Sequence, residues 1–187
     1  MSLIQLWMPI VLGAVFAWIA SAIIHMLLKY HNSDYQALSN EDEVSAAMRK
    51  GPPNVGFYCM PYCPDMSDMA KESMQQKFKQ GPVAFIAVFP SGMPNMGKLL
   101  VQQFSFFLIG CVLIAYCAAL ALAPDTEYLT VFRFVSTAGF LTFGWGVVPF
   151  SIWYGHPWST TAKYLLDALI YGLVVAGTFG WLWPAVA

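Results

Sequence analysis

The sequence is short of charge. Charged residues make up only 10% of its 187 residues, whereas ordinary soluble domains carry about 25%. Nine Lys and Arg residues with a net charge of -1 provide no basic face, which excludes a nucleic-acid partner. Four cysteines are too few for a disulfide framework. Because 58% of the residues are hydrophobic, this composition excludes a soluble domain and indicates a membrane protein.

Sequence signatures of catalysis are also missing. The chain has no phosphate-binding loop, dinucleotide fingerprint, serine-hydrolase elbow, zinc-protease motif or haem-attachment motif. We therefore expect a protein that is not an enzyme, and we predict no cofactor from these signatures. His25 is the one candidate ligand for a tetrapyrrole, but a single histidine in a membrane helix is more often hydrogen-bonded.

Long apolar runs dominate what is present. Runs of 18 or more such residues cover a bilayer core of about 30 Å as a helix. The runs predict helices over about 6–28, 99–121, 130–153 and 162–183, with a kink or an end at Pro149. The expected fold is an all-α integral membrane protein with four transmembrane helices in a compact bundle. Its parts are helix 1 (1–29), an insertion of about 69 residues (30–98) and a three-helix portion (99–187).

All four runs carry small residues at every fourth position. This spacing lets membrane helices approach closely, so we expect these residues at helix contacts. They are Gly13, Ala17 and Ser21; Cys111, Ala115 and Ala119; Ala138, Thr142 and Gly146; and Ala168, Gly172, Ala176 and Gly180.

The insertion sets the expected orientation. Seven of the nine Lys and Arg residues lie in it or directly beside it, and cytoplasmic connections carry an excess of these residues. We therefore expect a cytoplasmic insertion and both termini on the opposite side of the membrane. Two short helices are predicted within the insertion, at about 41–50 and at Ser67–Gln80. The apolar stretch Val83–Phe89 is expected to be a strand or an interfacial segment.

Asp167 is the most unusual residue of the apolar runs, because ionisable groups inside a membrane are costly and often functional. Lys163 lies four residues earlier, where it can pair with Asp167. His25 is expected at the same end of the bundle, and Tyr171 lies one turn deeper. One interpretation of this cluster is a proton-handling or ligand site. The other is a neutralised pair that fixes the register of the helices.

A second candidate site lies in the insertion. Cys59 and Cys63 are followed by Met66, and His31 is the nearest candidate for a third or fourth ligand. Thiolate and thioether ligands suit Cu(I) and related soft ions. However, zinc sites normally combine two cysteine pairs or add histidines. Packing of these residues is the competing interpretation.

The helix Ser67–Gln80 presents an apolar face that includes Met69, Met74 and Phe78. Methionine adapts to irregular partner surfaces, so we expect contact with another protein there. The expected partners are the lipid bilayer and other membrane subunits. The leading hypothesis is a non-catalytic accessory or scaffold subunit of a larger assembly, such as a photosynthetic or respiratory electron-transfer complex. The alternatives are a small proton-coupled transporter centred on Asp167 and a copper- or redox-handling protein centred on Cys59 and Cys63.

Several short strings resemble a group of bacterial multi-pass inner-membrane proteins of unknown function. The match covers most of the chain and implies a bacterial origin and a multi-helix membrane fold. It carries no catalytic assignment and does not include the cysteine pair. The matching strings are His31–Tyr35, Glu41–Glu43 with Arg49, Lys79–Pro82, Asn95–Lys98, Gly155–Ser159 and Gly177–Pro184.

Overall fold

The computed structural model describes residues 1–185 and divides the chain into two compact units. The helical unit comprises Met1–Tyr35 and the segment from Pro94 onward, and the insertion unit comprises Gln36–Met93. The insertion is therefore shorter than the expected 30–98, because residues 30–35 and 94–98 belong with the helices. Residues 186 and 187 of the expected three-helix portion lie outside the described residues.

Four helices within residues 1–185 are long and apolar enough to cross a membrane, as expected for a multi-pass protein. The first span, Leu3–Leu28, joins a short 3-10 helix (Leu3–Leu6), α1 (Trp7–Ala22) and a π-helical turn (Ile23–Leu28). The second is α4 (Met96–Ala121). The third, Tyr128–Trp153, joins α5 (Tyr128–Phe143), a 3-10 turn and α6 (Val148–Trp153). The fourth is α7 (Trp158–Trp181).

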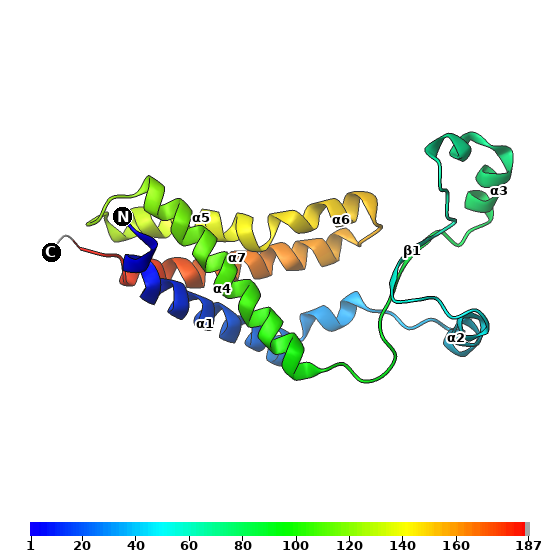
Figure 1. Ribbon diagram of the computed structural model, residues 1–187, viewed down its shortest axis with the longest axis horizontal. Helices are drawn as coiled ribbons and strands as arrows, with labels where there is room; N and C mark the ends of the chain where they lie inside the picture. Colours follow the sequence, from blue (N-terminus) through cyan, green and yellow to red (C-terminus); the bar gives the residue numbers. More distant parts are fainter. Residues whose placement is uncertain (186–187) are drawn as a thin grey trace. The chain divides into compact units, whose positions relative to one another are not determined.

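These helices pack around a shared apolar core. The broadest contact joins α5 to α7, and α1 lies against both α7 and α4. Figure 1 shows the start of α1 and the end of α7 at the same end of the helical unit. The most deeply buried side chains come from all four spans, and they include Leu6, Phe107, Ile114, Val131, Val175 and Phe179.

Two glycines let α5 and α7 touch backbone to backbone. A Cβ atom on Gly139 would lie 2.8 Å from the Gly172 Cα, and one on Gly172 would lie 2.9 Å from the Ser136 carbonyl oxygen. No side chain fits at either distance without movement of the helices. The Gly139–Gly172 crossing therefore fixes the separation of the two helices.

The predicted helix-contact residues divide into two groups. Most are buried or partly buried: Gly13, Ala17, Ser21, Cys111, Ala115, Ala168, Gly172 and Ala176 are buried, and Ala119, Ala138 and Gly180 are partly buried. The prediction for Thr142 and Gly146 is wrong, because both are exposed.

The error at Thr142 and Gly146 has a local cause. The buried positions of α5 are Val131, Val135 and Gly139, which have the same four-residue spacing one position further along. Gly144 also ends α5 ahead of the expected kink at Pro149, which stands in the first turn of α6. Pro149 has no N–H for the carbonyl four residues before it, so the helix cannot run through this point unbroken.

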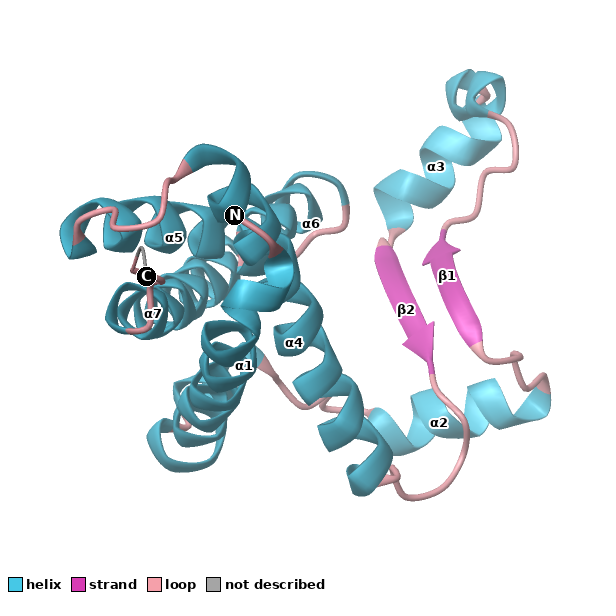
Figure 2. Cartoon of the chain, turned by 60° about the vertical axis from the view of Figure 1, so that its left-hand side comes forward, coloured by secondary structure: helices cyan, strands magenta, loops and turns pink. Residues whose placement is uncertain are grey.

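The insertion unit combines two short helices with a β-hairpin. Its helices are α2 (Glu41–Lys50) and α3 (Glu72–Gln80), and its strands are β1 (Gly56–Met60) and β2 (Ala84–Val88). The strands pair antiparallel, with Gly56 opposite Val88 and Met60 opposite Ala84, and lie side by side in Figure 2. The all-α expectation is therefore incomplete, since the stretch around 83–89 is a strand.

The expected helix Ser67–Gln80 is two pieces. A 3-10 helix covers Met66–Ala70, and Lys71 is extended before α3 begins. The Asp65 carboxylate accepts a hydrogen bond from the Ser67 backbone N–H at 2.9 Å. Asp65 therefore caps the 3-10 piece, while α3 begins without a side-chain cap.

No residue between 36 and 93 is buried. The unit is held by the hairpin, by local turns and by the stacked rings of Phe57 and Phe85, whose centroids lie 5.6 Å apart. Isolated two-stranded hairpins are marginally stable in water. The insertion unit thus lacks the kind of core that the helical unit has.

Candidate functional site

The last turn of the first span builds the candidate site. Ile23–Leu28 is wound as a π-helix, a form that often marks functional positions. Lys29 follows with a left-handed backbone (φ 51°), which is uncommon for a residue with a side chain. The chain then forms a 3-10 helix, Tyr30–Asp34, which contacts α7. This sharp turn carries Tyr30, His31 and Asp34 to the side of α7.

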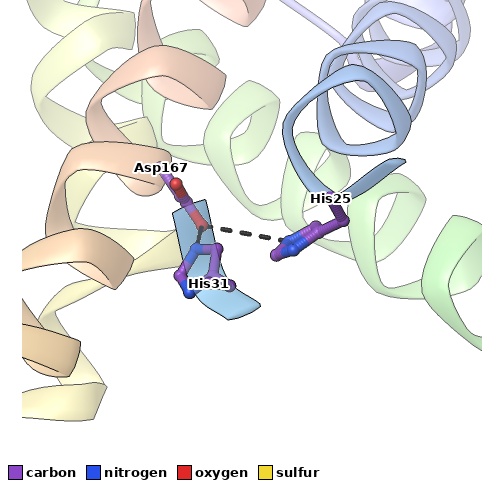
Figure 3. Close-up of side chains that lie close together, drawn as sticks. All are labelled: His25, His31 and Asp167. Atoms are coloured by element: carbon purple, nitrogen blue, oxygen red, sulfur yellow. Dashed lines mark hydrogen bonds and ion pairs between the residues drawn. The ribbon is translucent and has the colours of Figure 1, made fainter. Parts of the chain in front are cut away.

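Asp167 lies at the centre of the site and is buried. The Tyr30 hydroxyl donates a hydrogen bond to Asp167 Oδ1. His31 Nε2 lies 2.8 Å from Asp167 Oδ2, and His25 Nε2 lies 3.9 Å from the same oxygen. Figure 3 shows both imidazoles directed at this carboxylate from the end of the first span and from the 3-10 helix.

Asp167 is deeper in its helix than the sequence suggests. The fourth span was expected to begin at about Ala162, but α7 begins at Trp158, where the Thr161 N–H donates to the Pro157 carbonyl. Asp167 therefore lies nine residues along α7, or about 13 Å at 1.5 Å per residue. A carboxylate at this depth needs partners from elsewhere in the chain.

A second carboxylate continues the network away from Asp167. His31 Nδ1 lies 2.7 Å from Asp34 Oδ2. Asp34 Oδ1 accepts hydrogen bonds from Lys163 Nζ at 2.6 Å and from Thr160 Oγ1 at 3.1 Å. Lys163 Nζ also donates to the Tyr30 carbonyl oxygen at 2.9 Å. The four ionisable groups Asp167, His31, Asp34 and Lys163 thus form one connected chain.

Hydrogen-bond chemistry restricts where protons can lie in this network of four ionisable groups. Both ring nitrogens of His31 face carboxylate oxygens, at 2.7 and 2.8 Å, and an ionised carboxylate only accepts. Each of the two hydrogen bonds must therefore contain a proton. When both carboxylates are ionised, His31 is an imidazolium, and the charges of His31, Lys163, Asp34 and Asp167 sum to zero.

The groups outside the spans respond to these contacts. Burial raises the pKa of the Tyr30 hydroxyl well above its usual range, and the hydrogen bond to Asp167 adds to the shift. Burial also acts to raise the pKa of the Asp34 carboxyl. The hydrogen bonds from Lys163, His31 and Thr160 outweigh it, so that this pKa is lowered overall. Asp34 is therefore held as an anion.

The structure brings the four residues expected in the polar cluster to one region. His25 and Asp167 face each other, and Lys163 is joined to Asp167 through Asp34 and His31 rather than by the expected direct pair. Tyr171 is buried and interacts electrostatically with Asp167, and its ring packs edge-on against Phe107 with centroids 5.1 Å apart.

Sequence reasoning missed Tyr30, His31, Asp34 and Thr160 as members of the cluster, since it named His31 only among the soft-metal ligands. Their signal was available in part, because His31 and Asp34 are three residues apart directly after a span and match one face of a helical turn. The left-handed turn at Lys29 that brings them to α7 has no comparable signal, since lysine is not a residue that favours this backbone.

The proposed soft-metal ligands are divided between the two units. His31 belongs to the helical unit, where both of its ring nitrogens contact aspartates, and Cys59, Cys63 and Met66 belong to the insertion unit. Cys59 and Cys63 are free thiols, and Cys63 Sγ donates to the Asp65 carbonyl oxygen at 2.9 Å. The soft-metal role of these four residues remains a prediction.

The apolar face expected to contact partners is only partly covered. Met69 is 38% exposed, and Met74 and Phe78 are half-buried on α3. This face and the Asp167 cluster are the two candidate functional regions of the chain. No protein-family model, curated protein or solved structure matches the chain, so the functional argument rests on these two regions.

Proposed function

We propose that this protein is a non-catalytic accessory or scaffold subunit of a larger bacterial membrane assembly. The proposal rests on one observation, that no residue of the insertion unit is buried. Large apolar side chains are exposed throughout it, among them Val55, Tyr62, Met66, Phe89 and Met93.

A folded segment of this kind gains stability by covering its apolar side chains. Exposed apolar patches rimmed by polar residues mark surfaces for protein or membrane contact. Met74 and Phe78 are spaced four residues apart and share one face of α3, while Lys77 and Lys79 fall on other faces. The spacing fits an apolar groove on another protein better than it fits solvent.

The proposal includes an orientation. The excess of Lys and Arg in and beside the insertion supports a cytoplasmic location for this unit in a bacterial inner membrane, with both chain termini on the periplasmic side. The docking surface would then face cytoplasmic portions of the partner subunits.

The proton-coupled transporter receives less support. Beyond Asp167 and Tyr171, the buried positions of α7 are mainly apolar or small, such as Val175, Ala176 and Phe179. A transport path needs polar or ionisable groups along the bundle. The Asp167 network instead occupies one end of the spans.

Site-specific photo-crosslinking in native membranes tests the accessory role. A benzoylphenylalanine replaces Phe78 in one variant and Gln76 in the matched control. Two residues are about 200° around a helix, so the control probes the opposite face of α3. We expect one discrete adduct, heavier than the 20.7 kDa chain, from position 78 and a weaker one or none from position 76. Mass spectrometry of the adduct should identify another membrane subunit.

Two results would contradict the proposal. One is the absence of any protein adduct from position 78 in cells that express the chain at its native level. The other is equal labelling of many proteins from both positions, which would indicate random collision rather than a docked face.

A further inference from the structure

We propose that His25, His31 and Asp167 form a binding site for a divalent transition-metal ion of the Zn²⁺ class. The three residues come from the π-helical end of the first span, the 3-10 helix Tyr30–Asp34 and α7. Their ligand atoms all lie within 4.8 Å of one another. This inference is independent of the accessory role, because it concerns the helical unit alone.

The spacing of the ligand atoms suits one small cation. Two ligand atoms that are each about 2.0–2.1 Å from a tetrahedral ion lie about 3.3 Å apart. His31 Nε2 and His25 Nε2 lie 2.8 and 3.9 Å from Asp167 Oδ2, values on either side of that separation. The separation of the two imidazole nitrogens is within 4.8 Å, so a combined movement of the rings of up to about 1.5 Å would bring all three atoms to bonding distance.

The surroundings of the ligands have the form found around zinc. A metal-binding histidine almost always donates its second ring N–H to a carboxylate or carbonyl, which fixes the tautomer and orients the ring. His31 Nδ1 lies 2.7 Å from Asp34 Oδ2, so Asp34 can accept that proton and leave Nε2 for the ion. Asp34 is in turn held by Lys163 and Thr160, and Tyr30 holds the other oxygen of Asp167.

His25 adds a third candidate ligand to the pair formed by His31 and Asp167. Its ring makes no hydrogen bond with any described residue, although the ring of His31 lies beside it, tilted by 33°, with centroids 4.8 Å apart. The His25 side chain is 42% exposed, whereas that of Asp167 is 3% exposed. An ion can therefore enter past His25 and meet the buried carboxylate, and a water molecule can fill a fourth position.

The ligand chemistry selects the class of ion. Two imidazoles and one carboxylate suit Zn²⁺ and neighbouring divalent metals, whereas Mg²⁺ and Ca²⁺ prefer all-oxygen sites. Binding replaces the proton between His31 Nε2 and Asp167 Oδ2 and releases it to solvent. The metal would tie the first span to the fourth at the end of the bundle.

The test uses the full chain in detergent, with Cys59, Cys63 and Cys117 replaced by serine so that only the buried thiol of Cys111 remains. The chelator-treated protein is titrated with Zn²⁺ in equilibrium dialysis and with Co²⁺ as a visible-absorption probe. We expect close to one ion per chain and ligand-field bands of low coordination number. His25→Gln removes a half-exposed ligand at little cost to folding, and His156→Gln is the matched control, since His156 is a histidine outside the cluster.

The expected differences are large. His25→Gln should weaken binding by more than the ~10–100-fold that follows removal of a group that only supports a ligand, and Asp34→Asn should weaken it by about 10–100-fold. His156→Gln should bind as the parent does. The proposal is overturned if the parent chain shows no saturable binding, if His25→Gln binds as tightly as the parent, or if only the original cysteines confer binding. Circular dichroism of each variant confirms that the helices are retained.

Discussion

Two lysine–aspartate pairs of equal length belong to very different surroundings. Lys163 Nζ lies 2.6 Å from Asp34 Oδ1 in the helical unit, and Lys71 Nζ lies 2.6 Å from Asp68 Oδ1 in the insertion unit. The side chains of the first pair are 24% and 5% exposed, and those of the second are 65% and 32% exposed. Their distances do not distinguish them, but their burial does.

This contrast holds for the two units as a whole. The helical unit buries an apolar core and a connected set of charges, so each partner depends on the others. The insertion unit has local turns and one hairpin, and each of its contacts can be lost alone. The helical unit is therefore stabilised by its own buried contacts, whereas the insertion unit has no buried residue to stabilise it.

The largest predicted difference between the units follows from the two pairs. Lys163→Met leaves Asp34 buried without its cation, and breaking a buried pair in this way costs about 3–5 kcal/mol. We expect the lower part of that range, because Lys163 is partly exposed. Lys71→Met should change stability by about 0–1 kcal/mol, as for exposed pairs. Thermal or denaturant unfolding in detergent micelles measures both.

A double variant sharpens this prediction. Asp34→Asn with Lys163→Met removes both charges, so the combined loss should be smaller than the sum of the two single losses. Equal losses for Lys163→Met and Lys71→Met would show that burial does not separate the two pairs.

Hydrogen exchange provides the second prediction. The 3-10 helix Tyr30–Asp34 and α3 both lie outside the spans, so lipid does not shield either of them directly. Tyr30–Asp34 is held to α7 by the Asp167 network, whereas α3 has no buried residue. The free energy of local opening ranges from near zero to the global free energy of unfolding. We therefore expect backbone amides of α3 to exchange at least about 100-fold faster than those of Tyr30–Asp34.

If the proposed accessory role is correct, exchange in α3 should be slower in native membranes than in the isolated chain, and exchange in Tyr30–Asp34 should be unchanged. Equal exchange in the two segments of the isolated chain would mean that the buried network does not stabilise the turn.

The features predicted correctly from the sequence depend on long patterns. The four spans follow from apolar runs of more than 18 residues, and α2 follows from acidic residues at its start and basic residues at its end. Asp167 was identified because a charge inside such a run is rare. Each of these signals extends over several turns, so small errors in a boundary do not remove it.

The features missed depend on single backbone choices. The backbone at Lys29 is left-handed, and a lysine in the sequence does not predict this conformation. This turn brings His31 and Asp34 into contact with α7. Two sets of positions with four-residue spacing overlap α5, one that begins at Ala138 and one that begins at Val131. Composition alone favours the first set as the helix contact, because its residues are small. The second is buried, since the direction of α5 is set by its contact with α7.

The smallest predicted effect concerns the Gly139–Gly172 crossing. Gly172→Ala adds one methyl group that would lie 2.9 Å from the Ser136 carbonyl oxygen and 3.0 Å from the Phe140 nitrogen. Backbone atoms cannot move away as the end of a flexible side chain can, so α5 and α7 must separate, at a cost of about 1–3 kcal/mol in the free energy of unfolding.

Gly177→Ala is the matched control on the same helix, because a Cβ there meets nothing within 4 Å. Alanine also favours helix more than glycine does, so Gly177→Ala should leave stability unchanged or slightly higher. Unfolding of both variants in detergent measures the difference, and a Gly172→Ala protein as stable as Gly177→Ala would show that this contact does not hold the two helices at their observed separation.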